Sequence, residues 1–131
     1  MKTLLEHSAE ILILIFLFIT FFMSFLDKIT DWNGNILFLK DYFSKTFIHK
    51  FIPTILVKIV ILEAITAIFC VLGLYQIISY GTTFFALIAS ILSCIILLVF
   101  LLGQRIAKDF DGARNITIYF IAAVFAVFLF Q

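Results

Sequence analysis

The stretch that decides the fold runs from Phe51 to Tyr75, FIPTILVKIVILEAITAIFCVLGLY, and contains only two charged residues, Lys58 and Glu63. A helix needs roughly 20 predominantly apolar residues to cross a bilayer core of about 30 Å, and this stretch exceeds that length. Three further apolar runs follow the same pattern: Ile11 to Leu26, Thr82 to Leu102 and Ile116 to Phe130. Because the runs are continuous rather than alternating, they predict membrane-spanning helices and not the strands of a barrel.

The composition agrees with a membrane protein. Hydrophobic residues make up 65% of the 131 residues and charged residues 13%, whereas a soluble domain is about half apolar and a quarter charged. We therefore expect one all-α domain over residues 1–131, a four-helix transmembrane bundle with spans at about 5–27, 52–75, 80–103 and 114–130. No small-residue cleavage site follows the first run, so it is expected to remain as a span. The lipid bilayer is the predicted environment, and a net charge of +1 gives no sign of nucleic-acid binding.

The first connection, residues 28–50, is the longest polar segment. It opens with residues 31–34, Asp-Trp-Asn-Gly, which predict a turn because Gly after Asn tolerates a positive φ. From Asn35 to Phe51 the apolar residues recur at helical spacing, and the polar residues lie largely opposite. These apolar positions are Ile36, Leu39, Phe43 and Phe47. We expect a short amphipathic helix here, in the membrane interface or over the bundle. The alternative is an ordered loop with no function of its own.

The second connection is predicted to be a tight turn around Gly73. Tyr75 and Tyr80 flank it, and Tyr at the ends of spans marks the boundary with water. The second span is accordingly expected to end near Tyr75 and the third to begin near Tyr80.

The basic residues favour one orientation. The N-terminus, the second connection and the C-terminus share one side of the membrane and hold only Lys2. The other side holds Lys28, Lys40, Lys45, Lys50, Arg105, Lys108 and Arg114. Basic residues in short loops stay in the cytoplasm, so both polar loops are predicted to be cytoplasmic and both termini outside. Lys28, Lys40, Lys45, Arg105, Lys108 and Arg114 are the residues expected to face a partner or lipid head groups.

Glu63 is the leading candidate for a functional residue inside the membrane. At mid-span a charged carboxyl costs roughly 2.5 kcal/mol or more, so it should face protein or a cavity. Lys58 lies about 140° away around the helix and cannot pair with it on one stripe. Ser90 and Ser93 of the third span are expected at a comparable depth and could meet Glu63. Two interpretations stay open: a proton or ligand site, and a hydrogen-bond clamp between helices.

Other side chains give no evidence for catalysis. Cys70 and Cys94 are expected to differ in depth by roughly 15 Å, whereas a disulfide needs Cα atoms within about 7 Å. His7 and His49 stand alone, so no metal ligand set is apparent. Small residues at a spacing of four in the third span, from Thr82 to Cys94, predict close helix packing. No catalytic set, cofactor or metal is therefore predicted, and an enzyme is disfavoured.

The arrangement of motifs resembles the DoxX family of small four-helix bacterial and archaeal membrane proteins. The family tends to end its first span with Ser-Gly-x-x-Lys, and residues 24–28 read Ser-Phe-Leu-Asp-Lys, with Phe25 in place of Gly. Its second span often begins near a Pro and carries a Glu before an apolar run ending in Leu-Gly. Pro53, Glu63 and residues 71–74, Val-Leu-Gly-Leu, are similar to that pattern.

The resemblance implies a role rather than a reaction. It implies a non-enzymatic integral membrane subunit or accessory protein of a larger complex in a bacterial inner membrane, with a redox-linked complex as one possibility. The expected partner is another membrane protein or a second copy of the chain. The alternative is a small oligomeric transporter or proton-linked carrier that uses the carboxyl of Glu63.

Overall fold

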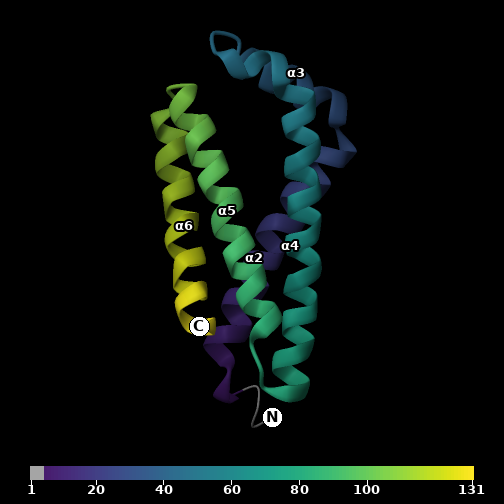
Figure 1. Cartoon of the computed structure of the whole chain (residues 1–131), viewed down its shortest axis with the longest axis vertical. Coiled ribbons are helices and arrows are strands. Elements are labelled where there is room, and N and C mark those ends of the chain that lie inside the picture. Colours follow the sequence, from purple (N-terminus) through teal and green to yellow (C-terminus); the bar gives the residue numbers. More distant parts are fainter. Residues whose placement is uncertain (1–4) are drawn as a thin grey trace.

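The computed structural model describes residues 5–131, and this part of the chain is helical without strands (Figure 1). Four helices are long and apolar enough to cross a membrane. They are α2 (Ser8–Thr30), α4 (Ile52–Tyr80), α5 (Phe84–Ile106) and α6 (Phe110–Phe130). The first connection contains α3 (Trp32–Tyr42) and a short 3₁₀ helix, η1 (Phe47–Phe51). The predicted all-α architecture with four spans is confirmed.

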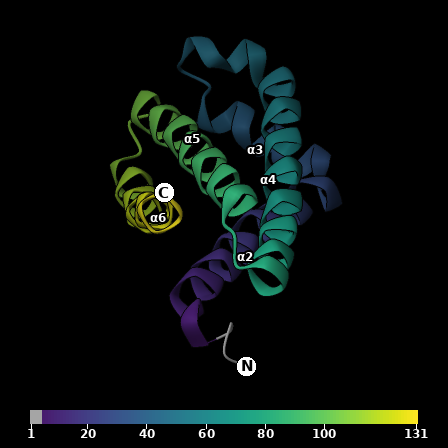
Figure 2. The same cartoon turned by 60° about the horizontal axis from the view of Figure 1, so that its bottom comes forward.

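The four long helices run alternately up and down. The first and third connections meet at the upper end of Figure 1, and the C-terminus lies near the opposite end. α5 lies between α4 and α6, α2 packs along α4, and α2 touches α6 more lightly, as the turned view also shows (Figure 2). The described core is shared by all four long helices, with Leu14, Phe21, Cys70, Ile96 and Ala123 among its members.

The turn between α4 and α5 corrects the sequence analysis. Gly73 is an interior residue of α4, and the helix continues to Tyr80. The chain reverses at Gly81, which has a φ of 70° and caps α4 in the left-handed conformation that favours glycine. The prediction of a turn around Gly73 was therefore wrong. Tyr75 marked a boundary of polarity, but a helix that leaves the apolar layer does not have to end there.

Gly73 has a packing role instead. A Cβ built on it would lie 2.9 Å from the backbone nitrogen of Ala86 and 3.0 Å from its Cα. The backbones of α4 and α5 thus approach closely at this level, which small residues permit. On α5 the residues that face the core are also small: Ala86, Ala89, Ser90 and Ser93 are all fully buried. The predicted small-residue stripe is a packing surface.

The first connection also differs from its predicted form. The residues assigned to a turn, 32–34, form the first turn of α3, and the change of direction falls at Asp31. The expected helix over residues 35–51 is divided, because α3 ends at Tyr42 and η1 begins at Phe47. α3 has no fully buried residue. It contacts α4, and it borders the site described below.

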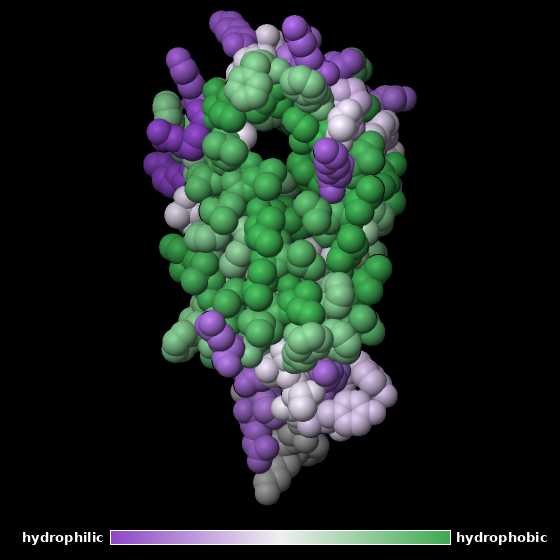
Figure 3. All heavy atoms as spheres, in the orientation of Figure 1, coloured by the Kyte–Doolittle hydropathy of each residue, from purple (hydrophilic) through white to green (hydrophobic). Residues whose placement is uncertain are grey.

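The outer surface is apolar around the bundle. Large hydrophobic side chains are exposed on every long helix, including Leu12, Ile68, Leu98 and Ile121. On the face drawn in Figure 3 the hydrophobic residues form a broad green band, with hydrophilic residues gathered beyond it at both ends. Such a band is the surface expected of a bundle surrounded by lipid.

Candidate functional site

Glu63 lies on the buried stripe of α4. The inward-facing residues of this helix recur at intervals of three, four and seven, and include Leu56, Glu63, Ala67 and Cys70. A helix places such positions on one face, so the carboxyl is directed toward α2 and α5 rather than toward lipid. Its side chain is fully buried.

The partner of Glu63 is Lys28, near the end of α2. The Lys28 Nζ lies 3.0 Å from the Glu63 Oε1, and the lysine side chain is only 16% exposed. Lys28 also donates a hydrogen bond of 2.6 Å to the Ser24 Oγ, and Ser24 donates one of 3.2 Å to the Glu63 Oε1. Because Ser24 and Lys28 are four residues apart, both face α4. We call Ser24, Lys28 and Glu63 the polar cluster.

The polar cluster is held among apolar groups. The Lys28 Nζ lies 5.5 Å from the centre of the Phe100 ring of α5, within the range of a cation–π contact. Burying two charges is costly, and their attraction offsets this cost only with good geometry and further hydrogen bonds. The Glu63 Oε2 is buried and has no hydrogen-bond partner among the described residues. The carboxyl can therefore accept one more donor.

Lys28 does not lie in a loop, as the sequence analysis expected. α2 continues to Thr30, beyond the predicted end of the span near residue 27. The additional turn carries Lys28 along the helix face that already holds Ser24. The prediction that it faces a partner or lipid is corrected: its side chain is mostly buried and is paired with Glu63.

Ser90 and Ser93 are buried as expected, but they do not hydrogen-bond Glu63. Ser90 donates to the Leu87 carbonyl and Ser93 to the Ala89 carbonyl, both on their own helix. Both hydroxyls are therefore engaged within α5 and are not donated to the carboxyl. Counted from the backbone contact between Gly73 and Ala86, Ser93 lies about 4–5 Å and Ser90 about 9 Å from the level of Glu63 along the bundle. On α5 it is Phe100 that contacts the polar cluster, through Lys28.

The observed register of α4 against α5 also changes the argument about the cysteines. Counted from the contact between Gly73 and Ala86, Cys70 and Cys94 differ in depth by about 7–8 Å, which is about half of the expected difference. Both cysteines are free, Cys70 fully buried and Cys94 partly buried. Across residues 5–131 no cluster of three or more His, Cys, Asp or Glu side chains could hold a metal ion.

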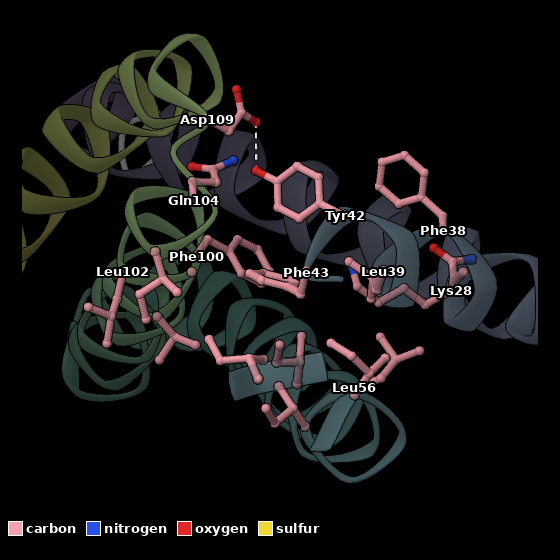
Figure 4. Close-up of a pocket in the computed structure, with 18 residues that line it drawn as sticks. Lys28, Phe38, Leu39, Tyr42, Phe43, Leu56, Phe100, Leu102, Gln104 and Asp109 are labelled. Atoms are coloured by element: carbon pink, nitrogen blue, oxygen red, sulfur yellow. Dashed lines mark hydrogen bonds between the residues drawn. The ribbon is translucent and has the colours of Figure 1, made fainter. Parts of the chain in front are cut away.

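A cavity of about 570 Å³ lies beside the polar cluster, between α3, η1, α4 and α5 (Figure 4). Lys28 borders it on one side. Most of its walls are apolar, with Leu39 and Phe43 from the first connection, Leu56 from α4 and Phe100 from α5. Figure 3 shows the corresponding hollow near the upper end of the molecule.

Tyr42 and Asp109 close one edge of the cavity. The Tyr42 hydroxyl donates a hydrogen bond of 2.6 Å to the Asp109 Oδ2, which joins α3 to the turn between α5 and α6 (Figure 4). Desolvation, together with the hydrogen bond and negative charge of Asp109, raises the pKa of Tyr42. The hydrogen bonds from Tyr42 and from the Gly112 N–H lower the pKa of Asp109. The sequence analysis did not select this pair, although Asp109 three residues before Gly112 is a typical helix N-cap.

A second cavity, of about 480 Å³, lies between α2 and α6. Ser24, Asp27 and Tyr119 are among the residues that line it, and Phe100 borders both cavities. The polar cluster contributes Lys28 to the first cavity and Ser24 to the second. It therefore stands between the two.

The remaining predicted basic residues lie at the surface of the loop end. Lys40, Lys45, Arg105, Lys108 and Arg114 are all exposed. Arg105 stacks at 4.7 Å on the Phe110 ring, and Arg114 forms a salt bridge with Asp111. Lys108 has a φ of 61°, a left-handed conformation just beyond the end of α5. These side chains come from both polar connections.

These features define a class of protein: a small multi-pass helical membrane protein with a buried ion pair beneath a mostly apolar cavity. The chain matches no protein-family model, no curated protein and no solved structure.

Proposed function

We propose that the chain is a non-enzymatic integral membrane subunit or accessory protein of a larger complex in a bacterial inner membrane, similar to the DoxX family. The three residues of the polar cluster belong to the segments that carry this resemblance, and their mutual contacts support it. A redox-linked complex is one assembly of this kind. The chain would contribute binding surface and not chemistry.

The observation that carries the proposal is the charged surface at the loop end, on which lysines and arginines stand among the exposed Asp31, Asp41 and Asp111. Lys40 and Lys45 come from the first connection, and Arg105 and Lys108 from the third. The Tyr42–Asp109 hydrogen bond joins the two connections, so these charges are presented together. An ordered surface made by two short loops favours a protein partner, since complementary charge gives specificity.

The proposed orientation places this charged surface in the cytoplasm. Lys40, Lys45, Lys50, Arg105, Lys108 and Arg114 lie in or next to short connections at this end, where the positive-inside rule applies. Lys28 also belongs to this end but is neutralised by Glu63. Lys2, counted for the opposite side, lies outside the described residues.

The test is capture of the native complex. The tagged protein, solubilised in a mild detergent, is expected to retain a membrane-protein companion that mass spectrometry identifies. Arg105→Glu with Lys108→Glu should reduce its recovery at least several-fold, while Arg105→Lys with Lys108→Arg, which keeps both charges, should not. Equal recovery with all three forms would contradict the proposed surface.

The second candidate is a proton-linked carrier in an oligomer, with Glu63 as the group that binds the proton. The unpaired Glu63 Oε2 and the two flanking cavities favour it. Against it, the other fully buried polar residues described, Thr66, Ser90 and Ser93, bond to carbonyls of their own helices. They offer no polar path from Glu63 to the opposite end.

Proton flux into liposomes tests the carrier. Protein reconstituted into vesicles containing a pH-sensitive dye should show flux that Glu63→Gln removes, with Lys58→Gln as the matched control on the same helix. Flux equal to that of empty vesicles would eliminate this candidate and leave the subunit proposal standing.

A further inference from the structure

The cavity bordered by Lys28, Tyr42 and Gln104 has the size and lining of a ligand-binding site. Its volume of about 570 Å³ falls within the range of small-molecule sites, about 300–1,000 Å³. Its walls are mainly aliphatic and aromatic, and water does not fill such a space well because it finds few polar partners. If such a cavity is empty, the side chains along its walls lose van der Waals contacts. An apolar ligand body would restore those contacts.

The cavity is open toward the side of the bundle. Two of its lining residues on α5, Val99 and Leu102, are 41% and 62% exposed and belong to the apolar outer surface. The hollow in Figure 3 lies next to the hydrophobic band and below the polar end. A molecule dissolved in the bilayer could enter here without crossing water.

The polar side chains around the cavity specify the head group of such a molecule. The Gln104 Oε1 is buried and accepts no hydrogen bond from the described residues. It needs a donor, which a hydroxyl supplies. Among residues 5–131, Lys28 is the one lysine or arginine that lines the cavity, and its ammonium is already engaged by Glu63 and Ser24. Asp109, with its lowered pKa, adds a negative charge at the other edge. An anionic head would meet more negative than free positive charge.

From these observations we propose that the cavity binds one neutral, single-chain lipid with a hydroxyl-bearing head, of the monoacylglycerol class. The hydroxyl donates to the Gln104 Oε1 near the Tyr42–Asp109 edge. The chain lies against the apolar walls and leaves past Val99 and Leu102 into the bilayer. The inference goes beyond the proposed subunit function and does not depend on the identity of a protein partner.

The test uses a monoacylglycerol that carries a photoactivatable diazirine on its chain, mixed into phosphatidylcholine vesicles containing the full-length protein. After irradiation, peptide mass spectrometry should locate saturable labelling in residues 99–106 and 38–43. Unlabelled monoacylglycerol should compete for the site, and phosphatidylglycerol and a free fatty acid should compete at least tenfold less well.

Three variants sharpen the result. Gln104→Leu keeps the size of the side chain but removes the acceptor, and should weaken competition about five- to tenfold. Ile55→Trp fills the cavity from α4 and should abolish saturable labelling. Ile59→Phe fills it less severely and serves if the tryptophan variant does not fold. Ile91→Trp, on the exposed face of α5 and away from the cavity, is the matched control.

Two outcomes would overturn the inference. Labelling spread evenly over the lipid-facing helices and unaffected by Ile55→Trp and Ile59→Phe would show that the cavity holds no lipid. Equal competition by the anionic lipids, or undiminished competition in Gln104→Leu, would refute the neutral hydroxyl head.

Discussion

Lys28 and Glu63 depend on each other because each would be an uncompensated buried charge alone. Removing one member of a buried ion pair typically costs about 3–5 kcal/mol, whereas replacing both with apolar residues is often neutral. We therefore expect Lys28→Met and Glu63→Leu each to lower the free energy of unfolding in detergent by about 3–5 kcal/mol. The double variant should recover most of that loss, which a double-mutant cycle measures.

Lys58→Met is the control for this cycle. Lys58 is exposed, so its replacement should change the free energy of unfolding by less than about 0.5 kcal/mol. If the losses of the two single variants simply added in the double variant, Lys28 and Glu63 would not be coupled.

The Tyr42–Asp109 hydrogen bond should stabilise the protein only within a limited range of pH. Asp109 has a lowered pKa, so its contribution to stability is present above its ordinary value of 3.8 and is lost as the pH falls through the lower folded value. Tyr42 has a raised pKa, so its contribution is present below its ordinary value of 10.0 and is lost as the pH rises through the higher folded value. The protection of α3 against hydrogen exchange, relative to the intrinsic exchange rate at each pH, should be greatest between these two limits.

Tyr42→Phe provides the comparison. It should lower the protection of α3 inside this range of pH and remove the loss of that protection at alkaline pH. In an ultraviolet titration of tyrosinate, the difference between the parent and Tyr42→Phe should show Tyr42 ionising well above pH 10.0. Ionisation of Tyr42 near 10.0 would contradict the hydrogen bond.

At this scale the sequence predicted Glu63 better than its partner. An acidic residue amid apolar neighbours is informative because its burial is costly wherever the helix ends. Lys28 could be assigned only with the length of α2 known, since a lysine at a span end can equally face head groups. Its spacing of four from Ser24 was the available signal. Tyr42 and Asp109 are 67 residues apart, and no local pattern connects them.

Gly73 sets the distance between α4 and α5. Because a Cβ at this position would meet the backbone of Ala86, relief requires movement of a helix and not of a side chain. Gly73→Ala is expected to lower the free energy of unfolding by about 1–3 kcal/mol despite the better helix propensity of alanine. Thermal unfolding in detergent measures the change.

Gly103→Ala is the matched control on α5. The nearest atom to its added Cβ is the Phe43 Cζ at 3.3 Å, which belongs to a side chain. Its effect should stay within about 1 kcal/mol, the range of helix propensity. Equal effects of the two substitutions would show that the α4–α5 contact does not limit stability.

Element ends were harder to predict than elements. Continuous apolar runs locate the four spans, because a helix must have about 20 apolar residues to cross the bilayer core. Helix α4, however, extends past Tyr75 through Gln76 and Tyr80 before Gly81 stops it. Polar residues such as Gln76 indicate where the membrane ends, whereas a glycine in the left-handed conformation, here Gly81, indicates where the helix ends. The register of α5 against α4 depends on the second signal.

For the whole molecule, the orientation in the membrane can be measured directly. In a background with Cys70→Ala and Cys94→Ala, a single cysteine at Ser44 should react with an impermeant maleimide only after the cells are opened. A single cysteine at Thr82, in the connection at the opposite end, should react in intact cells. Both positions are exposed. The reverse pattern would place the basic loops outside.

The ion pair between α2 and α4 also constrains how the chain is made. Helix α4, released singly into lipid from the translocon, would carry the charged Glu63 into the hydrocarbon, at a cost of about 2.5–3.5 kcal/mol for a mid-span residue. If α2 and α4 are released as a hairpin, Glu63 is paired with Lys28 before it meets the acyl chains. We therefore expect the first two spans to leave the translocon together. A ribosome stalled between them should hold an intermediate that alkaline extraction still removes from the membrane.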